Sequence, residues 1–252
     1  SFTDETDHFL YSRFHNPTVA MFQDRLAALE GGEACIATSS GMSAIMTVAM
    51  SHLQAGDHVV CSRSVFGATI QLFNSILSKF GIETTYVDMA NLDSWKAAVK
   101  PNTKLFYLET PSNPLTEVGD IAAIAKIAKA ANALYVVDNC FCTPALQKPL
   151  ELGADVIIHS ATKYLDGQGR VLGGAIVGTE EFVLGKVFPY VRTAGPTLSA
   201  FNAWVLLKGL ETLNLRLEKQ SQSALELATW LRSILRLSVC ITQAYLHTHS
   251  MS

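Results

Sequence analysis

The sequence predicts an α/β fold with a mainly parallel central sheet buried between layers of helices. Short apolar segments of strand length alternate along the chain with longer amphipathic segments. Several short segments are apolar on both faces, as expected of strands covered by helices. The alternation favours parallel strands joined by right-handed crossovers. With 252 residues, 49% of them hydrophobic, the chain can form one large domain, or one large domain and part of a second.

The order of the expected elements follows from these patterns. Strands are predicted over residues 58–62, 83–87, 105–109, 134–138, 155–159 and 174–177. Helices are predicted over residues 17–30, 43–53, 68–80 and 121–131, and each stops near a glycine or asparagine, as helix C-termini do. Residues 198–235 are almost wholly helical in pattern, so we expect the chain to leave the sheet domain there.

Charge and composition exclude several classes of partner. The net charge is -3, with 19 basic and 22 acidic residues, which gives no footprint for a nucleic-acid backbone. No polybasic run or membrane-length apolar segment suggests a membrane partner, and the first residues lack a signal-peptide pattern. We therefore expect a cytoplasmic protein with neither a nucleic-acid nor a membrane partner.

The cysteines also indicate a reducing, cytoplasmic environment. There are five, an odd number at irregular spacing, which argues against a disulfide framework. Cys140 and Cys142 form a C-x-C pair, for which a metal or redox site is conceivable. No second pair accompanies them, so buried thiols are the favoured interpretation and no metal site is expected.

Ligands of open α/β sheets bind beyond the carboxyl ends of the strands, where this chain places several polar groups. One of them is the turn Ser39-Ser40-Gly41-Met42, which opens a helix. Its free backbone N–H groups and the positive end of the helix dipole form a candidate anion site. An ordinary helix N-cap is an equally good interpretation of this turn alone.

Asp138 and Lys163 each follow an expected strand, 134–138 and 155–159. A carboxylate at the end of an apolar strand needs a positive partner, such as a pyridinium nitrogen, although a structural cap is the simpler reading. A lysine in this position is expected to be partly desolvated, which favours the nucleophilic neutral amine. It could also be an ordinary surface lysine. Together with the anion site, the two residues match the ring nitrogen, aldehyde and phosphate of one cofactor, pyridoxal phosphate.

Six ordered motifs carry a resemblance to a known family. They are Y-S-R-F-H-N-P-T from Tyr11, S-S-G-M-S-A-I from Ser39, E-T-P-S-N-P from Glu109, V-V-D-N-C-F-C-T-P from Val136, H-S-A-T-K-Y from His159, and G-P-T-L-S-A-F-N-A-W from Gly195. From Tyr11 to about Arg232 the chain resembles the Cys/Met-metabolism family of fold-type I pyridoxal-phosphate enzymes. The resemblance implies the three-layer large domain of that fold.

The resemblance assigns roles around the cofactor ring. It implies that Lys163 holds pyridoxal 5'-phosphate as a Schiff base and that Asp138 keeps the ring nitrogen protonated. Asn113 is similar to the residue that hydrogen-bonds the ring hydroxyl. Phe66 stands where the family commonly has a tyrosine, so it can stack on the ring but cannot transfer a proton. Proton transfer is therefore expected to rest more on Lys163.

The resemblance also assigns the phosphate site. Backbone N–H groups of Gly41 and Met42 and the hydroxyls of Ser160 and Thr162 are expected to bind the phosphate. Tyr11 and Arg13 match a pair that reaches the phosphate of the neighbouring subunit, and the forked guanidinium suits that task. The resemblance thus implies a homodimer or homotetramer with shared active sites. From the residues alone, Tyr11 and Arg13 would be a solvated N-terminal segment.

The implied division has three parts. Residues 1–16 form an arm that contributes to the partner's active site, residues 17–197 form the cofactor-binding large domain, and residues 198–252 form a long helix and the start of a C-terminal domain. The resemblance fades after about Arg232, and no arginine for a substrate carboxylate can be assigned. We therefore expect a truncated chain that largely lacks the small C-terminal domain.

The implied reaction is γ-replacement on an activated homoserine. Phe66 and the segment G-Q-G-R-V-L-G-G from Gly167 are most similar to the O-succinylhomoserine sulfhydrylase branch, which implies that sulfide displaces succinate, or acetate from O-acetylhomoserine, to give homocysteine in methionine biosynthesis. Cystathionine synthesis and γ-elimination are alternatives with the same cofactor, and an inactive remnant is an alternative of another class. A nicotinamide-dependent dehydrogenase is disfavoured because Leu172 occupies the third glycine position of G-x-G-x-x-G.

Overall fold

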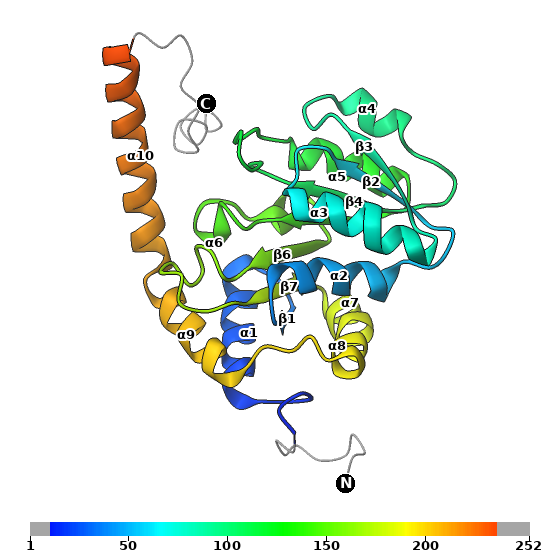
Figure 1. Ribbon diagram of the computed structural model, residues 1–252, viewed down its shortest axis with the longest axis horizontal. Coiled ribbons are helices and arrows are strands. Elements are labelled where there is room, and N and C mark those ends of the chain that lie inside the picture. The colour runs from blue at the N-terminus through cyan, green and yellow to red at the C-terminus, as the bar shows by residue number, and fades with distance from the viewer. Residues whose placement is uncertain (1–10, 236–252) are drawn as a thin grey trace.

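A computed structural model describes residues 11–235, and the side chain of Leu235 lies outside the description. Within this range the strands are β1 (Ala34–Thr38), β2 (His58–Ser62), β3 (Glu83–Val87), β4 (Thr103–Glu109), β5 (Leu134–Asp138), β6 (Val156–Ser160) and β7 (Gly174–Gly178). They form one sheet in the order β1-β7-β6-β5-β4-β2-β3 (Figure 1). Strand β7 runs opposite to all the other strands of this described sheet, so the predicted mainly parallel sheet is confirmed.

The helices join and cover these strands. They are α1 (Pro17–Glu30), α2 (Gly41–His52), α3 (Gly67–Gln71), α4 (Leu92–Ala97), α5 (Ile121–Ala130), α6 (Thr143–Leu146), α7 (Glu180–Phe182), α8 (Phe188–Ala194), α9 (Ala200–Glu211) and α10 (Leu213–Leu235). Shorter π-helical or 3₁₀ turns lie at Leu72–Ile76, Leu77–Phe80, Pro149–Leu152 and Val183–Val187.

Several predicted boundaries are wrong for local reasons. The helix predicted over 68–80 is broken into α3, a π-helical turn and a 3₁₀ turn. The helix predicted over 198–235 is interrupted at Thr212, between α9 and α10. The helix predicted from residue 43 begins at Gly41, because the Ser40 side chain accepts the Ser43 N–H and forms a capping box.

The sheet is buried between two helical layers, and the core is divided accordingly. On one face α2 and α8 cover alternate strand residues such as Val59, Tyr107 and Ile158. On the other face α1 and α9 pack on the β1, β6 and β7 end, while α4 and α5 pack toward the β3 and β4 end. The three-layer architecture is therefore confirmed, and it leaves the carboxyl ends of β4, β5 and β6 free to carry a site.

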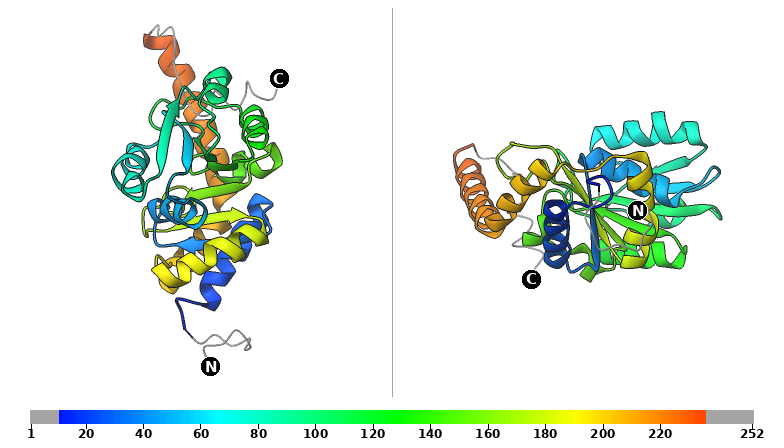
Figure 2. Two further views of the ribbon diagram at one scale, coloured as in Figure 1. Left: turned by 90° about the vertical axis from the view of Figure 1, so that its right-hand side faces the viewer. Right: turned by 90° about the horizontal axis from the view of Figure 1, so that it is seen from below.

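Helix α10 leaves this body at the side of α9. Its first turns are held by the buried side chains of Leu213 and Leu217, whereas Trp230 and Ile234 near its end are exposed. Figures 1 and 2 show the helix protruding from the sheet domain in all three views. No helix of residues 11–235 is long and apolar enough to cross a membrane. The predictions for residues 1–10, for Cys240 and for residues 236–252 lie outside the described residues.

Candidate active site

One cavity of about 800 Å³ gathers most of the predicted site residues. It lies at the carboxyl ends of β4, β5 and β6, since the last residue of each strand lines it. Eight of the ten candidates line this cavity: Gly41, Met42, Phe66, Asn113, Asp138, Ser160, Thr162 and Lys163. The expectation that polar strand ends converge on one edge of the sheet is therefore met.

The N-terminus of α2 forms one wall of the cavity. Ser40 caps the helix and satisfies the Ser43 N–H, which leaves the Gly41 and Met42 N–H groups at the positive end of the helix dipole. The helix approaches β6 so closely that a Cβ atom on Gly41 would lie 2.7 Å from the Ser160 Cβ. A glycine is required for this approach, which produces a cradle of backbone donors beside a serine hydroxyl that suits a phosphate.

Thr162 has a different role from Ser160 in this structure. Its hydroxyl donates to the Gly173 carbonyl at 3.2 Å and accepts the Gly173 N–H at 3.1 Å. The threonine therefore ties the turn after β6 to the start of β7. Because its single O–H proton is donated to Gly173, the predicted bond to a phosphate oxygen would require the hydroxyl to turn away from that carbonyl.

Lys163 follows β6 in a turn closed by its own backbone. Its N–H donates to the Ser160 carbonyl at 3.2 Å, and its carbonyl accepts the Gly167 N–H at 2.8 Å. The side chain faces the cavity but the residue is exposed in this chain. The expected partial desolvation is therefore wrong for the chain as described, because the cavity is open. A nucleophilic role of Lys163 would therefore have to depend on its position and on a ligand that closes the space.

Asp138 is buried at the end of β5, 9% exposed, and accepts two hydrogen bonds. The donors are the Cys140 N–H at 3.0 Å and the Tyr107 hydroxyl at 3.2 Å. Burial raises the pKa of Asp138, while these donors and the nearby His159 lower it. Among the described residues, Asp138 forms no ion pair with lysine or arginine, so a protonated ring nitrogen would supply its missing cation.

Glu109 is a site residue that the sequence reasoning did not single out. It ends β4 beside Asp138, lines the cavity and accepts the Phe66 N–H at 2.7 Å. Burial and the Asp138 carboxylate raise the pKa of Glu109 to about 8. The available signal was its position at the end of a predicted apolar strand, the same signal that identified Asp138.

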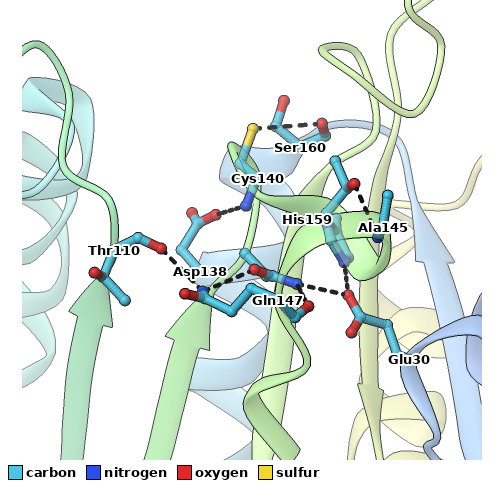
Figure 3. A network of polar contacts seen from close by, with 10 residues as sticks. Glu30, Thr110, Asp138, Cys140, Ala145, Gln147, His159 and Ser160 are labelled. Carbon is cyan, nitrogen blue, oxygen red and sulfur yellow. Dashed lines mark hydrogen bonds and ion pairs between the residues drawn. The ribbon is translucent and has the colours of Figure 1, made fainter. Parts of the chain in front are cut away.

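A buried polar network supports the strand ends from behind (Figure 3). Glu30 on α1 pairs with the His159 ring and accepts from the Asn139 amide at 3.0 Å. The Gln147 amide extends the network to the Asn139 side chain at 3.0 Å and to the Thr110 carbonyl at 3.1 Å. Glu30 and His159 are completely buried. The network ties the residues that follow β4 and β5 to α1, and α1 to His159 of β6. Sequence patterns gave no sign of it because its members are far apart in the chain.

Tyr11 and Arg13 do not reach the cavity of their own chain. The Arg13 guanidinium donates to the Arg192 carbonyl and lies 4.8 Å from the centre of the Phe14 ring. The Tyr11 ring packs edge-on against the same phenylalanine. This placement agrees with a role outside their own active site, but it leaves the predicted contact with a neighbouring subunit untested.

The cysteines differ in part from expectation. Cys35 and Cys61 are buried, whereas Cys140 and Cys142 are only partly buried, and Cys140 lines the cavity. The prediction of buried thiols is therefore wrong for the C-x-C pair, because it lies in the loop after β5 and not within the strand. Among residues 11–235, no group of three or more histidine, cysteine or acidic side chains is arranged to hold a metal ion.

Fold and cavity together define the class of protein. A phosphate cradle at a helix N-terminus, a buried strand-end carboxylate and a lysine one strand further fit the three functional groups of pyridoxal phosphate, and the fold is that of fold-type I enzymes. The family model described as Cys/Met metabolism PLP-dependent enzyme matches residues 1–247, a longer range than the motif resemblance covers. The chain belongs to this family, whose cofactor is pyridoxal phosphate.

Individual relatives agree with this assignment. The chain is 59% identical over 230 residues to the O-succinylhomoserine sulfhydrylase of Pseudomonas aeruginosa, which covers 91% of this chain and 57% of the relative. It is 44% identical over 233 residues to an L-methionine gamma-lyase of Treponema denticola, and the match covers 91% of this chain and 58% of that relative. The crystal structure of metB from Corynebacterium glutamicum superposes with a TM-score of 0.90 at 37% identity. The superposition covers 92% of this chain and 60% of that protein. The chain thus spans less than two thirds of the length of these proteins.

Proposed function

We propose that this chain forms the cofactor-binding part of an enzyme that replaces the γ-substituent of O-succinylhomoserine, or of O-acetylhomoserine, with sulfide to give homocysteine. The observation that carries the proposal is the convergence of the α2 N-terminus, Asp138 and Lys163 on one cavity. The 59% identical O-succinylhomoserine sulfhydrylase supports the particular reaction.

The residues of the cavity divide the work of holding the cofactor. Gly41, Met42 and Ser160 would bind its phosphate, Asp138 would pair with its ring nitrogen, and Asn113 would bind its ring hydroxyl. Bound pyridoxal phosphate supplies an aldehyde that captures amines and a ring that takes up negative charge. Phe66, at the rim and 48% exposed, would cover one face of the ring.

Lys163 would serve as both nucleophile and base. Its Nζ would bond to the cofactor and, once displaced by the substrate amine, would accept the α-proton of the substrate. Phe66 has no hydroxyl with which to share this task, and Glu109 is engaged by the Phe66 N–H. Lys163 is therefore the side chain of the cavity best suited to carry protons between the α- and β-carbons.

The reaction can be tested by product analysis. The protein is incubated with pyridoxal phosphate and O-succinylhomoserine, and with either sulfide or cysteine as the second substrate. Homocysteine formed with sulfide, and lost in Lys163→Ala, is the expected result. Cystathionine formed with cysteine, with no homocysteine from sulfide, would contradict the choice of nucleophile. Cofactor absorbance without any product would favour a non-catalytic remnant.

Elimination from methionine is a second candidate. The 44% identity to an L-methionine gamma-lyase favours it, since the two reactions can use the same cofactor site. The discriminating measurement is release of methanethiol from methionine in the absence of sulfide. Release faster than homocysteine synthesis would make elimination the principal activity.

A further inference from the structure

Two carboxyl groups lie side by side in the cavity, and the proposed function uses only one of them. Glu109 and Asp138 are the last residues of β4 and β5, and they are directly paired in the register of these strands. They are only 4% and 9% exposed, and both line the cavity. Within the described chain neither forms an ion pair with lysine or arginine, so nothing neutralises a second negative charge.

Hydrogen bonds decide which carboxyl group ionises first. Asp138 accepts two, from the Cys140 N–H at 3.0 Å and the Tyr107 hydroxyl at 3.2 Å. Glu109 accepts one, from the Phe66 N–H at 2.7 Å. Two adjacent carboxylates in a poorly solvated site repel each other, so the better solvated one keeps the charge. Asp138 therefore carries the negative charge, and Glu109 holds a proton at neutral pH, as its pKa of about 8 also indicates.

The surroundings of the pair offer little compensation. The titratable groups that share an electrostatic interaction or hydrogen bond with the pair are Cys61 on β2, Tyr107 on β4, Cys140 after β5 and His159 on β6, and Lys163 lines the same cavity. Lysine is the one ordinary cation among them, and it faces the open cavity. A cation bound directly at Asp138 would consequently be the strongest change that Glu109 can experience.

We propose that Glu109 is a positioning residue that releases its proton when a protonated ring nitrogen pairs with Asp138, and that it then holds the Phe66 backbone as a carboxylate. The inference rests on the proposed cofactor site. The proton passes from the Glu109 carboxyl to solvent, and no other bond is made or broken. The Phe66 N–H bond becomes charge-assisted and shorter, which fixes the residue at the rim of the cavity.

This coupling has a measurable consequence. A protein in which Glu109 is protonated before binding releases one more proton on binding the cofactor than a protein without this group. Its affinity for the cofactor therefore increases more steeply with pH. Above about pH 9 the carboxyl group is already ionised in the free protein, and this additional dependence on pH disappears. Glu109→Gln keeps an oxygen that can accept the Phe66 N–H but has no proton to release.

The test is calorimetric titration of cofactor-stripped protein with pyridoxal phosphate, in two buffers with different ionisation enthalpies, which counts released protons. At pH 7 we expect Glu109→Gln to release nearly one proton fewer per bound cofactor than the wild type. The difference should vanish at about pH 9.5. Glu117→Gln is the matched control. Glu117 is an exposed carboxylate that accepts a hydrogen bond from the Ser64 hydroxyl at 2.5 Å, in the loop that also carries Phe66. This variant should release as many protons as the wild type.

A second variant covers the case in which Glu109→Gln fails to fold. In Asp138→Asn there is no carboxylate to pair with a protonated ring nitrogen, so the trigger for ionisation of Glu109 is absent and proton release should fall in the same way. Equal proton release by wild type and both variants would overturn the coupling while leaving cofactor binding intact. Failure of the wild type to bind pyridoxal phosphate would instead overturn the proposed function.

Discussion

At the scale of single residues, the site depends on small differences between similar groups. Asp138 and Glu109 are both strand-end carboxyl groups, yet Asp138 accepts two hydrogen bonds and Glu109 one, while burial and the Asp138 carboxylate raise the pKa of Glu109 to about 8. We propose that Phe66, at the position where a tyrosine is expected, leaves proton transfer to Lys163. The chemistry of the cavity is thus determined by neighbours that a motif alone does not specify.

Removal of the Phe66 ring should weaken cofactor binding. In Phe66→Ala the expected loss is about 1 kcal/mol, roughly a fivefold increase in the dissociation constant, because one face of the cofactor ring loses its aromatic neighbour. Titration followed by cofactor absorbance measures it. Phe66→Tyr keeps the ring and should bind like the wild type, and an alanine variant that binds equally well would show that the ring does not stack.

At the scale of elements, the position of α2 against β6 and β7 creates the phosphate cradle. The motif around Ser39 predicted an anion site, but only the packed structure shows that Gly41 lies against Ser160. Strand β1 was missed for a related reason. The short segment Ala34–Thr38 is defined by its pairing with β7, and pairing between residues more than 130 positions apart has no local signal. Strand ends near Asp138 and Lys163 were predictable because apolar runs and polar stops are local.

A side chain at Gly41 should disturb this packing. Gly41→Ala would put a Cβ atom 2.7 Å from Ser160 Cβ and 2.9 Å from its Cα, so helix or strand must shift. We expect a loss of about 1–3 kcal/mol in the free energy of unfolding, together with weaker phosphate binding. Gly185→Ala, where a Cβ atom meets nothing within 4 Å, is the control in denaturant unfolding. If both variants unfold like the wild type, the approach is not as tight as described.

The opposite end of the sheet should make stability depend on pH. His58 is buried and bonded through its two ring nitrogens to the Thr103 and Thr85 hydroxyls, each at 2.8 Å. Burial and Lys100 lower the pKa of His58 below 6.5. The unfolded chain then binds a proton first, and stability is lost as pH falls below about 6.5.

The variant His58→Gln should show a shallower decrease of melting temperature between about pH 7 and pH 5. His52, whose pKa is also lowered by burial, remains in both proteins and accounts for part of the residual slope. An unchanged slope would mean that His58 is not the group that takes up the proton.

At the scale of the whole molecule, the sheet domain presents an open cavity whose lining includes Gln220 of α10, while Arg13 and the far end of α10 lie away from it. Arg13 contacts its own Arg192 carbonyl, and α10 protrudes with Trp230 and Ile234 exposed. We propose the division into an arm of residues 1–16, a large domain of residues 17–197 and a second unit from residue 198. We also propose that Tyr11 and Arg13 complete the phosphate site of a neighbouring subunit in a homodimer or homotetramer.

The central claim is that the Lys163 amine bonds to pyridoxal phosphate, and trapping of that bond tests it most directly. The protein is incubated with the cofactor, reduced with borohydride, digested and analysed by mass spectrometry. The account predicts one principal phosphopyridoxyl adduct, on the peptide that contains Lys163, which is absent from Lys163→Ala and retained in Lys148→Ala. An adduct on another lysine, or none at saturating cofactor, would contradict it.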